Sequence, residues 1–523
     1  MGRLYQIAAA CAASAIAIAV FYASTSLQTT ESLALPAQGK NETVLFFINT
    51  EYGLSNVHLA TASALQQKHS CIDVHIASFP RTASKVARIS YLTQQQSPSA
   101  REIHFHELPG PEYTKALSDR TGGQANSSRH LMHQPGIKGL DKLLSHVQAA
   151  ISPWEGSDHI HIYQRAVEII RTVDPAVVVL DTTLRPAIDA TRQTNRLYAY
   201  LTPNTLADTF FGDQPYGSMF WKYPRMGSDF AFPVPWRKIP ENVYITTRFI
   251  YAVLNRPNFR ATKAYLKAHG ISDSIVLPRP DRPWISQNMP GASIPLVFTP
   301  PNVTSVGPII LEDRPVTEQD PELASWLLRA PTVLINLGSL FTYTGEQEIT
   351  MALAIQHMLA KTNVQVLWKV ARENTYSNTD YMLPIRSYIE NGRLRIMDWL
   401  RVSPVSLLKT GHIIASIHHG GANCYHEAIA AGVPQVIIPM WLDLYNYAQM
   451  AEDIGVGVYA TRGIAPKWTV ENLRESFLRV VDGGEESVRM RKMAKKFGDL
   501  AAEKPGRFVA AEEIVRLAGS GCG

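Results

Sequence analysis

The chain has 523 residues, of which 46% are apolar and 18% charged, so it is a globular protein that is too long for one core. We expect two domains of roughly 200 to 250 residues each. The net charge is +5, from 50 basic and 45 acidic residues, and no run of Lys or Arg stands out, which argues against nucleic acid as a partner. The four cysteines are scattered without a CxxC or a Cys/His cluster, so neither a disulfide framework nor a zinc site is predicted.

The first 24 residues contain an uncharged apolar segment, 7–22, which follows Arg3. This segment is long for the apolar part of a signal peptide and short for a spanning helix, so a signal-anchor and a cleaved signal peptide both stay open. No clean small-x-small cleavage site follows, which favours the anchor. The N-terminal positive charge places the rest of the chain across the membrane, and the glycosylation sequons at Asn41, Asn126 and Asn302 agree. We therefore expect a single-pass membrane glycoprotein of the endoplasmic reticulum or secretory pathway, with its bulk in the lumen.

Strand and helix patterns alternate from Thr43 onwards, as in a doubly wound α/β domain with a buried parallel sheet. The first domain is predicted to span 40–310, and its apolar strands are 43–49, 72–78, 102–108, 176–181 and 196–203. Residues 204–290 differ, because they are rich in aromatic residues and prolines. That composition fits either the lining of an apolar ligand pocket or an irregular insertion packed on the domain.

A polar linker, 311–331, separates this domain from a second α/β pattern. The second domain is predicted to span 332–504, with a C-terminal helix and tail at 505–523. Its expected strands are 332–340, 364–370, 393–399, 412–419 and 435–440. Two such domains in tandem place a ligand site between them, at the carboxyl ends of the strands.

One turn in the second domain has the pattern of an anion site. A strand ends at His419, Gly420 and Gly421 form a tight turn, and a helix is predicted for 422–431. Free N–H groups at a helix start favour a phosphate, and His419 can donate a further hydrogen bond. The chain has no GxxxxGK[ST] motif and no GxGxxG in its first strand–helix unit, so neither a P-loop ATPase nor a nicotinamide enzyme is expected.

Several ordered residues around this turn resemble the signature of the family 1 UDP-sugar glycosyltransferases, which have the two-domain GT-B fold. The resemblance extends from about Thr43 to about Lys504, is more specific in the second half, and is strongest to fungal members. The matching positions are Trp399, His419-Gly-Gly-Ala-Asn, Glu427, Gly432-Val-Pro, Pro439 and Asp443.

The resemblance implies a role in UDP-sugar binding for residues of the second domain. Uracil would stack on an aromatic ring, the ribose would bind a carboxylate, and the diphosphate would lie on two strand-to-helix turns. The resemblance implies Trp399 for uracil, Glu427 for the ribose and Asp443 for the sugar hydroxyls. For the diphosphate it implies His419, Gly421, Asn423, Cys424, Gly338 and Ser339.

The same resemblance implies no cofactor beyond the UDP-sugar and no metal. His418 and His419 are neighbours on a predicted strand, where side chains alternate between faces, so they are not expected to chelate one ion. His418 is expected to be structural.

Two departures from the family pattern affect the donor site. The family usually has Gln directly after the Asp that contacts the sugar, whereas this chain has Leu444, which leaves the sugar in doubt. The usual Pro-Gln after the tryptophan is Arg401-Val402, and the spacing from Trp399 to His419 is two residues longer than in the common plant pattern.

A third departure concerns the catalytic base. The resemblance implies a His after the first strand that deprotonates the acceptor in an inverting transfer, with an Asp that orients it. Asp181 fits the Asp, but Leu54 stands at the position of the His. His58 lies one helical turn further on the same face, so we predict His58 as the base. Glu51, or an acceptor that is itself nucleophilic, is the alternative.

The sequence thus predicts a membrane-anchored UDP-glycosyltransferase that moves a hexose, with glucose expected, onto a hydroxyl of a lipophilic small molecule such as a secondary metabolite. A nucleotide-sugar epimerase of the same architecture and a catalytically impaired nucleotide-sugar-binding homologue are the competing functions. The identity of the acceptor does not follow from the sequence, because acceptor pockets are built from variable loops.

Overall fold

The computed structural model describes residues 36–519, apart from positions 38, 123–127, 256, 272–273, 275–280 and 373–379. The predicted anchor at 1–24 and the sequon at Asn126 lie outside the described residues. Across the described ranges, no helix combines the length and the apolar character needed to cross a membrane.

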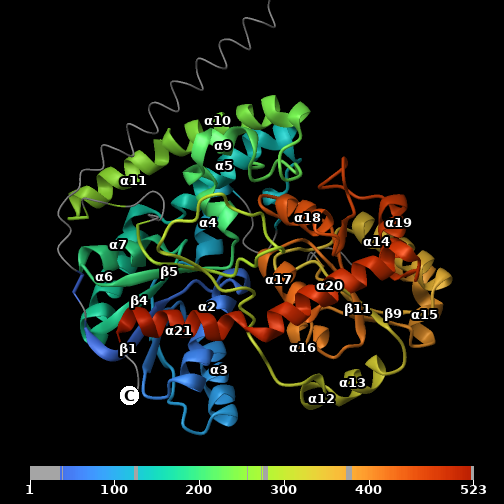
Figure 1. Cartoon of the computed structure of the whole chain (residues 1–523), viewed down its shortest axis with the longest axis horizontal. Helices are drawn as coiled ribbons and strands as arrows, with labels where there is room; N and C mark the ends of the chain where they lie inside the picture. The colour runs from blue at the N-terminus through green and yellow to red at the C-terminus, as the bar shows by residue number, and fades with distance from the viewer. Residues whose placement is uncertain are drawn as a thin grey trace, which may run out of the picture.

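The described part of the first domain is built on a parallel seven-stranded sheet in the order β3-β2-β1-β4-β5-β6-β7 (Figure 1). Crossover helices between parallel strands cover both faces of such a sheet, which is why its central strands β1 and β4 are largely apolar. The strands are β1 Lys40–Phe47, β2 Asp73–Ser78, β3 His104–Glu107, β4 Pro175–Asp181, β5 Tyr198–Thr202, β6 Trp284–Ser286 and β7 Val303–Ser305.

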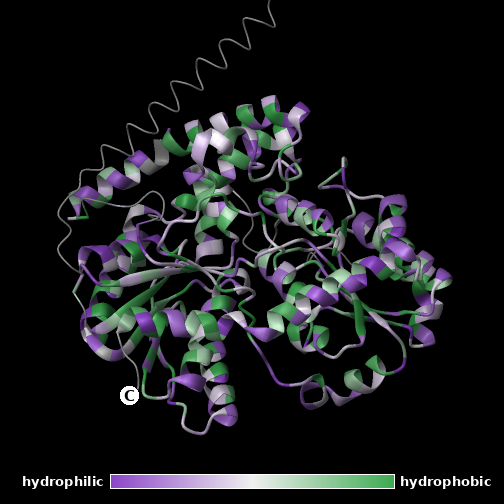
Figure 2. Ribbon diagram, viewed as in Figure 1, coloured by the Kyte–Doolittle hydropathy of each residue, from purple (hydrophilic) through white to green (hydrophobic). Residues whose placement is uncertain are grey.

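Alternate residues of β1 separate into two cores. Val44 and Phe46 pack on one face with the helix α2, whereas Leu45 and Phe47 pack on the other face with the helix α6. The helices of this domain are α2 Tyr52–Lys68, α3 Ala83–Gln96, α4 Tyr113–Thr121, α5 Leu140–Ile151, α6 Gly156–Val173, α7 Arg185–Gln193, α8 Leu206–Phe210, α9 Ser218–Trp221, α10 Ile239–Leu254 and α11 Pro257–Ala268. Figure 2 shows the apolar strands enclosed by helices whose outer faces are polar.

Much of the aromatic segment 204–290 forms helices on top of the domain, while its β6 joins the sheet and Asn204 contacts the second domain. Phe230, Val234 and Ile245 pack with Leu140 and Leu144 of α5 in a small separate core. Several of its aromatic side chains are exposed instead, among them Tyr216 at 92%, Trp236 at 74% and Trp221 at 46%. These contacts match the interpretation of the segment as a packed insertion.

The second domain has a parallel sheet of six described strands, in the order β10-β9-β8-β11-β12-β13. The strands are β8 Thr332–Asn336, β9 Gln365–Lys369, β10 Leu394–Met397, β11 Ile413–His418, β12 Gln435–Ile437 and β13 Gly457–Tyr459. The helices are α14 Gly345–Lys361, α15 Arg386–Glu390, α16 Pro404–Leu408, α17 Ala422–Ala431, α18 Leu444–Asp453, α19 Val470–Val481 and α20 Glu485–Glu503. Together the two sheets form the GT-B architecture.

The chain crosses between the domains twice. The predicted linker contains α12 Val316–Gln319 and α13 Pro321–Leu327, which pack on the second domain through Val316, Leu323 and Trp326. The last helix, α21 Gly506–Ala518, returns to the first domain, where Ala511 and Ile514 join the core beside α2 (Figure 1). The C-terminal segment is therefore part of the first domain in space.

Candidate functional site

The turn between β11 and α17 exposes backbone to a ligand. Gly420 has φ +94°, and a Cβ there would lie 2.7 Å from Cγ2 of Ile437, so the turn requires glycine. Gly421 precedes α17 and no side chain caps the helix, which leaves the first N–H groups of α17 for an anion. The predicted bounds of this helix are confirmed.

His419 is held between two glycines. A Cβ on Gly338 would lie 2.6 Å from Cε1 of His419, and a Cβ on Gly421 would lie 2.9 Å from the same atom. Nδ1 of His419 is buried and has no hydrogen-bond partner within the part of the chain that the structure describes. Burial lowers the pKa of His419 to about 3, so the ring is neutral near pH 7. A fixed, neutral imidazole with an unused nitrogen suits the diphosphate that the sequence assigns to it.

His418 is already fully engaged. Its Nε2–H donates to Oε1 of Gln435 at 2.8 Å, and its Nδ1 accepts from the backbone N–H of Gly420 at 3.0 Å. These bonds fix the tautomer of His418 and couple it to the turn, which is a structural role.

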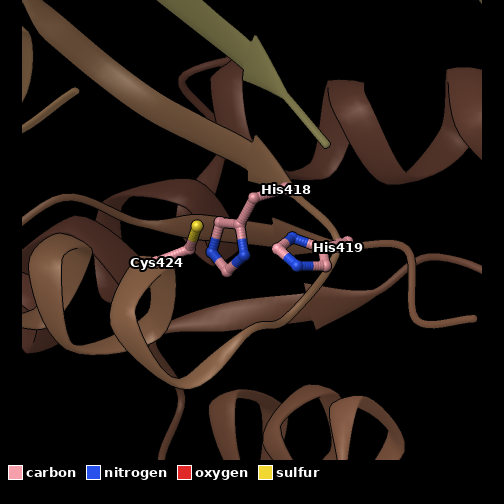
Figure 3. Close-up of side chains that lie close together, drawn as sticks. All are labelled: His418, His419 and Cys424. Atoms are coloured by element: carbon pink, nitrogen blue, oxygen red, sulfur yellow. The ribbon is translucent and has the colours of Figure 1, made fainter. Parts of the chain in front are cut away.

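His418, His419 and Cys424 nevertheless come together, with one ligand atom of each within 4.8 Å of the others (Figure 3). The expectation that the two histidines diverge is wrong, because β11 ends at His418 and His419 already belongs to the turn. A metal ion would displace one of the two hydrogen bonds of His418 and would need the thiolate of Cys424, whose pKa burial raises.

The loop after β8 forms the second side of the turn. Gly338 has φ +91°, and Ser339 beside it is exposed. The carbonyl of Gly338 accepts a hydrogen bond of 2.7 Å from Nζ of Lys369, the last residue of β9. Sequence reasoning missed Lys369, because β9 has the pattern of an ordinary buried strand.

Trp399 follows β10 and presents a large aromatic surface beside this loop. Its side chain is 50% exposed, which leaves a ring face open for a planar base. Nζ of Lys369 lies 4.0 Å from its ring centroid, and the ring of Tyr52 from the first domain is 6.4 Å away.

Glu427 lies in α17, partly buried, and faces the first domain. Burial raises its pKa to about 7, and the nearby Lys85 of α3 partly offsets this effect. Lys85 itself donates to Oδ1 of Asn56 at 2.6 Å, so the pair interacts through space rather than by direct contact. An interdomain hydrogen bond lies close by, from Nδ2 of Asn423 to the carbonyl of Tyr52 at 3.0 Å.

Asp443 precedes α18 and meets the first domain at Asn204. Nδ2 of Asn204 donates to Oδ2 of Asp443 at 3.2 Å. Burial and the neighbouring carboxylate of Asp208 raise the pKa of Asp443 to about 7. Leu444, which stands where the family usually has Gln, is buried. An amide therefore lies beside Asp443 after all, but it comes from the other domain.

The structure does not bring His58 and Asp181 into a hydrogen-bonded pair. Asp181 is buried, and its Oδ2 accepts from N and Nδ2 of Asn49 at 3.3 and 3.2 Å. Its Oδ1 accepts from N and Oγ1 of Thr183, both at 2.8 Å. His58 is 0% exposed and lies edge-on to Phe46, with ring centroids 6.3 Å apart. Burial lowers the pKa of His58 to about 4, and the carboxylate of Asp181 only partly offsets this.

Glu51 lies at the start of α2, next to the interdomain contact of Tyr52. Its Oε1 accepts from N of Thr114 at 2.8 Å and from the hydroxyl of the same residue. Its Oε2 is buried and has no partner. Burial raises the pKa of Glu51, and the nearby Asp181 raises it further. The hydrogen bonds from Thr114 lower this pKa and offset the effect in part.

A cavity of about 550 Å³ lies elsewhere, between the linker helices and α16. Its walls include Val316, Leu327, Val405 and His412. These residues lie at the amino edge of the second sheet, whereas Gly338 and His419 lie at its carboxyl edge, so this cavity is separate from the candidate site residues.

Relatives of the chain carry the same architecture and chemistry. A model of the C-terminal domain of erythromycin biosynthesis protein CIII-like proteins matches residues 387–515. The glycosyltransferase sdnJ of Sordaria araneosa is 33% identical over 513 residues, which cover 91% of this chain and 98% of that relative. The vancomycin aglycone glucosyltransferase of Amycolatopsis orientalis is 26% identical over 264 residues, which cover 50% of this chain and 56% of that enzyme.

Solved structures show the same fold. A UDP-glucosyltransferase from Polygonum tinctorium matches with a TM-score of 0.59 and 17% identity, over 92% of this chain and 99% of the other. An anthocyanidin 3-O-glucosyltransferase solved in complex with UDP matches with a TM-score of 0.58 and 12% identity, over 92% and 100%. These relatives favour a transferase over the epimerase and over the impaired homologue. The chain belongs to the family 1 glycosyltransferases of GT-B fold and is a UDP-glycosyltransferase.

Proposed function

We propose that this enzyme transfers a hexose, glucose first among the sugars to test, from a UDP-sugar to a hydroxyl of a lipophilic small molecule with inversion. The observation that supports the donor most strongly is the turn around His419, whose unpartnered Nδ1 and uncapped helix α17 lie together. Several relatives are named for glucose and for small-molecule acceptors, among them the vancomycin aglycone and anthocyanidin enzymes.

In this proposal the second domain binds the donor. Trp399 stacks on uracil, Glu427 accepts from the ribose hydroxyls, and Asp443 contacts the sugar. The diphosphate lies between His419 and the N–H groups near Gly421, Asn423 and Cys424 on one side and Gly338 and Ser339 on the other. No step in the proposal requires a metal.

Two side chains compete for the role of base, and their contacts favour Glu51. His58 is sealed in the core beneath Phe46, and the oxygens of Asp181 already accept four hydrogen bonds. Glu51 is only partly buried, lies next to the interdomain contact, and keeps one oxygen without a partner. A carboxylate with a raised pKa is a competent base for a hydroxyl.

We further propose that the enzyme is anchored in the membrane by its N-terminal segment, with the catalytic part in the lumen of the secretory pathway. Two observations support this location besides the sequence of residues 1–24. Asn302, in a glycosylation sequon, is exposed. Cys71 is disulfide-bonded, and such bonds persist in oxidising compartments. Protease protection of microsomes, with and without detergent, tests the proposal.

The deciding experiment crosses a panel of UDP-sugars with a panel of apolar alcohols and phenols, read by mass spectrometry. We expect a product heavier by one hexose, formed only when both donor and acceptor are present, and of inverted anomeric configuration by NMR. An interconverted UDP-sugar without acceptor would show an epimerase instead. Binding of UDP-sugars without any turnover would show the impaired homologue.

A further inference from the structure

Lys369 is a buried cation without a counter-charge. Its side chain is 5% exposed, and its one hydrogen bond goes to a neutral group, the carbonyl of Gly338. Among the residues that the structure describes, no carboxylate lies within ion-pair distance of Nζ of Lys369. Burying an unpaired ammonium is costly, so the free enzyme holds a charge that its own side chains leave uncompensated.

The groups that face Lys369 are neutral near pH 7. Across the described elements around it they are the imidazole of His419 in the turn after β11, the thiol of Cys424 in α17, and the ring of Trp399 after β10. Burial accordingly lowers the pKa of Lys369 to about 8, and Cys424 offsets this only in part. None of these described neighbours carries a negative charge, so the positive charge of Lys369 is available to a bound anion.

The position of Lys369 identifies the anion. Strand β9 pairs with β8, so the end of β9 lies beside the loop that carries Gly338. That loop and the turn of His419 are the two sides of the diphosphate site in the proposed function. The nearest ligand charge to the ammonium would thus be the diphosphate, with the uracil on Trp399 beside it.

We propose that Lys369 is a donor-binding residue that contacts the diphosphate of the UDP-sugar and supplies the positive charge of that site. The inference rests on the proposed function, because it takes UDP as the ligand. As the C1–O bond of the sugar breaks and UDP leaves with the electron pair, the ammonium of Lys369 stabilises the departing charge.

The inference predicts a proton taken up on binding. In the free enzyme Lys369 loses its proton around pH 8. The bound diphosphate raises the pKa of Lys369 and so keeps it protonated. Binding of UDP at pH 8 to 9 is therefore accompanied by uptake of part of a proton. UDP itself contributes nothing, because its terminal phosphate is already ionised there, with a pKa of about 6. Affinity for UDP is expected to fall about tenfold between pH 7 and pH 9, following the fraction of Lys369 that keeps its proton.

Calorimetric titration of the full-length enzyme with UDP, in pairs of buffers that differ in ionisation enthalpy, measures this uptake directly. We expect Lys369→Met to bind UDP at least tenfold more weakly at pH 7 and to lose the uptake. Lys369→Arg, which stays charged, should bind UDP at pH 9 as it does at pH 7. Lys361→Met, at an exposed lysine of α14, is the matched control and should behave as the wild type.

Uridine, which lacks phosphate, shows whether the variant site is folded, since its affinity should not depend on Lys369. Should uridine binding be lost in Lys369→Met, the comparison of wild type with Lys369→Arg decides. Proton uptake that persists in Lys369→Arg, or unchanged UDP affinity in Lys369→Met, would overturn the inference. A wild-type enzyme that binds no UDP at any pH would instead overturn the proposed function.

Discussion

The two domains share one architecture but prepare their sites in opposite ways. In the second domain the groups around the turn of His419 are hydrogen-bond donors: the uncapped start of α17 and the ammonium of Lys369, whose one hydrogen bond among the described residues goes to the carbonyl of Gly338. In the first domain the turn after β1 presents acceptors instead: Asp181 accepts four hydrogen bonds from Asn49 and Thr183, while Oδ1 of Asn49 and Oε2 of Glu51 have no partner among the described residues. The turn of His419 is therefore suited to bind an anion, while the unpartnered carboxylate oxygen of Glu51 is suited to accept a proton.

The largest effect is expected at Glu51, because it concerns turnover itself. Glu51→Gln should lower kcat by about 10² to 10⁴-fold, the usual contribution of a general base, with UDP affinity unchanged. It should also remove the rise of activity with pH that follows ionisation of a carboxyl of raised pKa. Steady-state kinetics across pH, with an acceptor from the panel, measures both.

His58→Gln is the matched comparison for Glu51. His58 is fully buried, so we expect a loss of roughly 1–3 kcal/mol in the free energy of unfolding, with kcat of the folded enzyme nearly kept. If His58→Gln abolishes turnover while Glu51→Gln does not, the base is His58. The carboxylate of Glu51 would then not be the group that distinguishes the first domain from the second.

The next largest effect is expected in the donor site, at Gly338. An alanine there would strain a backbone with φ +91° and would place its Cβ 2.6 Å from Cε1 of His419. Displacing that ring should weaken UDP binding on the order of 100-fold. Gly455→Ala, also at positive φ but with nothing near its Cβ, controls for backbone strain alone.

Removal of the aromatic ring at Trp399 should have an intermediate effect. Trp399→Ala is expected to weaken UDP binding about tenfold or more, since stacking of a base on an aromatic ring contributes about 1–3 kcal/mol. Trp399→Phe should retain most of the affinity. Equal loss for inorganic pyrophosphate, which has no base, would contradict the stacking role.

The smallest effect is expected where the domains meet, at Asn204. Asn204→Ala removes one hydrogen bond to Asp443, so a change of a few-fold in the KM for the UDP-sugar is expected. The affinity for UDP alone should stay the same. A UDP affinity that falls with it would place Asn204 outside the sugar site.

The sequence predicted the turn between β11 and α17 well because backbone geometry constrains it. The start and end of α17 followed from the glycines on either side, and Gly420 and Gly338 both have positive φ. The short strands β6 and β13 were missed, since three residues are too few to show a pattern. Lys369 was missed for a different reason: a lysine at the end of an apolar strand is ordinarily exposed, and only the structure shows that it is buried.

The acceptor half was harder to predict because side chains, and not the backbone, decide it. Residue spacing placed His58 on the same helical face as Leu54. It did not show that the side chain of His58 is buried against Phe46. The amide beside Asp443 was invisible in the same way, because Asn204 is more than two hundred residues away in the chain. Contacts between domains leave no periodic signal in a single sequence.

The double crossing of the chain has a consequence for how the enzyme opens. Arg507, at the start of α21, forms an ion pair with Glu312, at the start of the linker, so the two connections lie side by side. Two adjacent connections define a hinge axis. The domains can rotate apart about that axis, while rotation about other axes is restricted. Because Asn204, Asn423 and their partners bridge the domains at the site itself, such a rotation would break those bonds to admit a UDP-sugar and remake them around it.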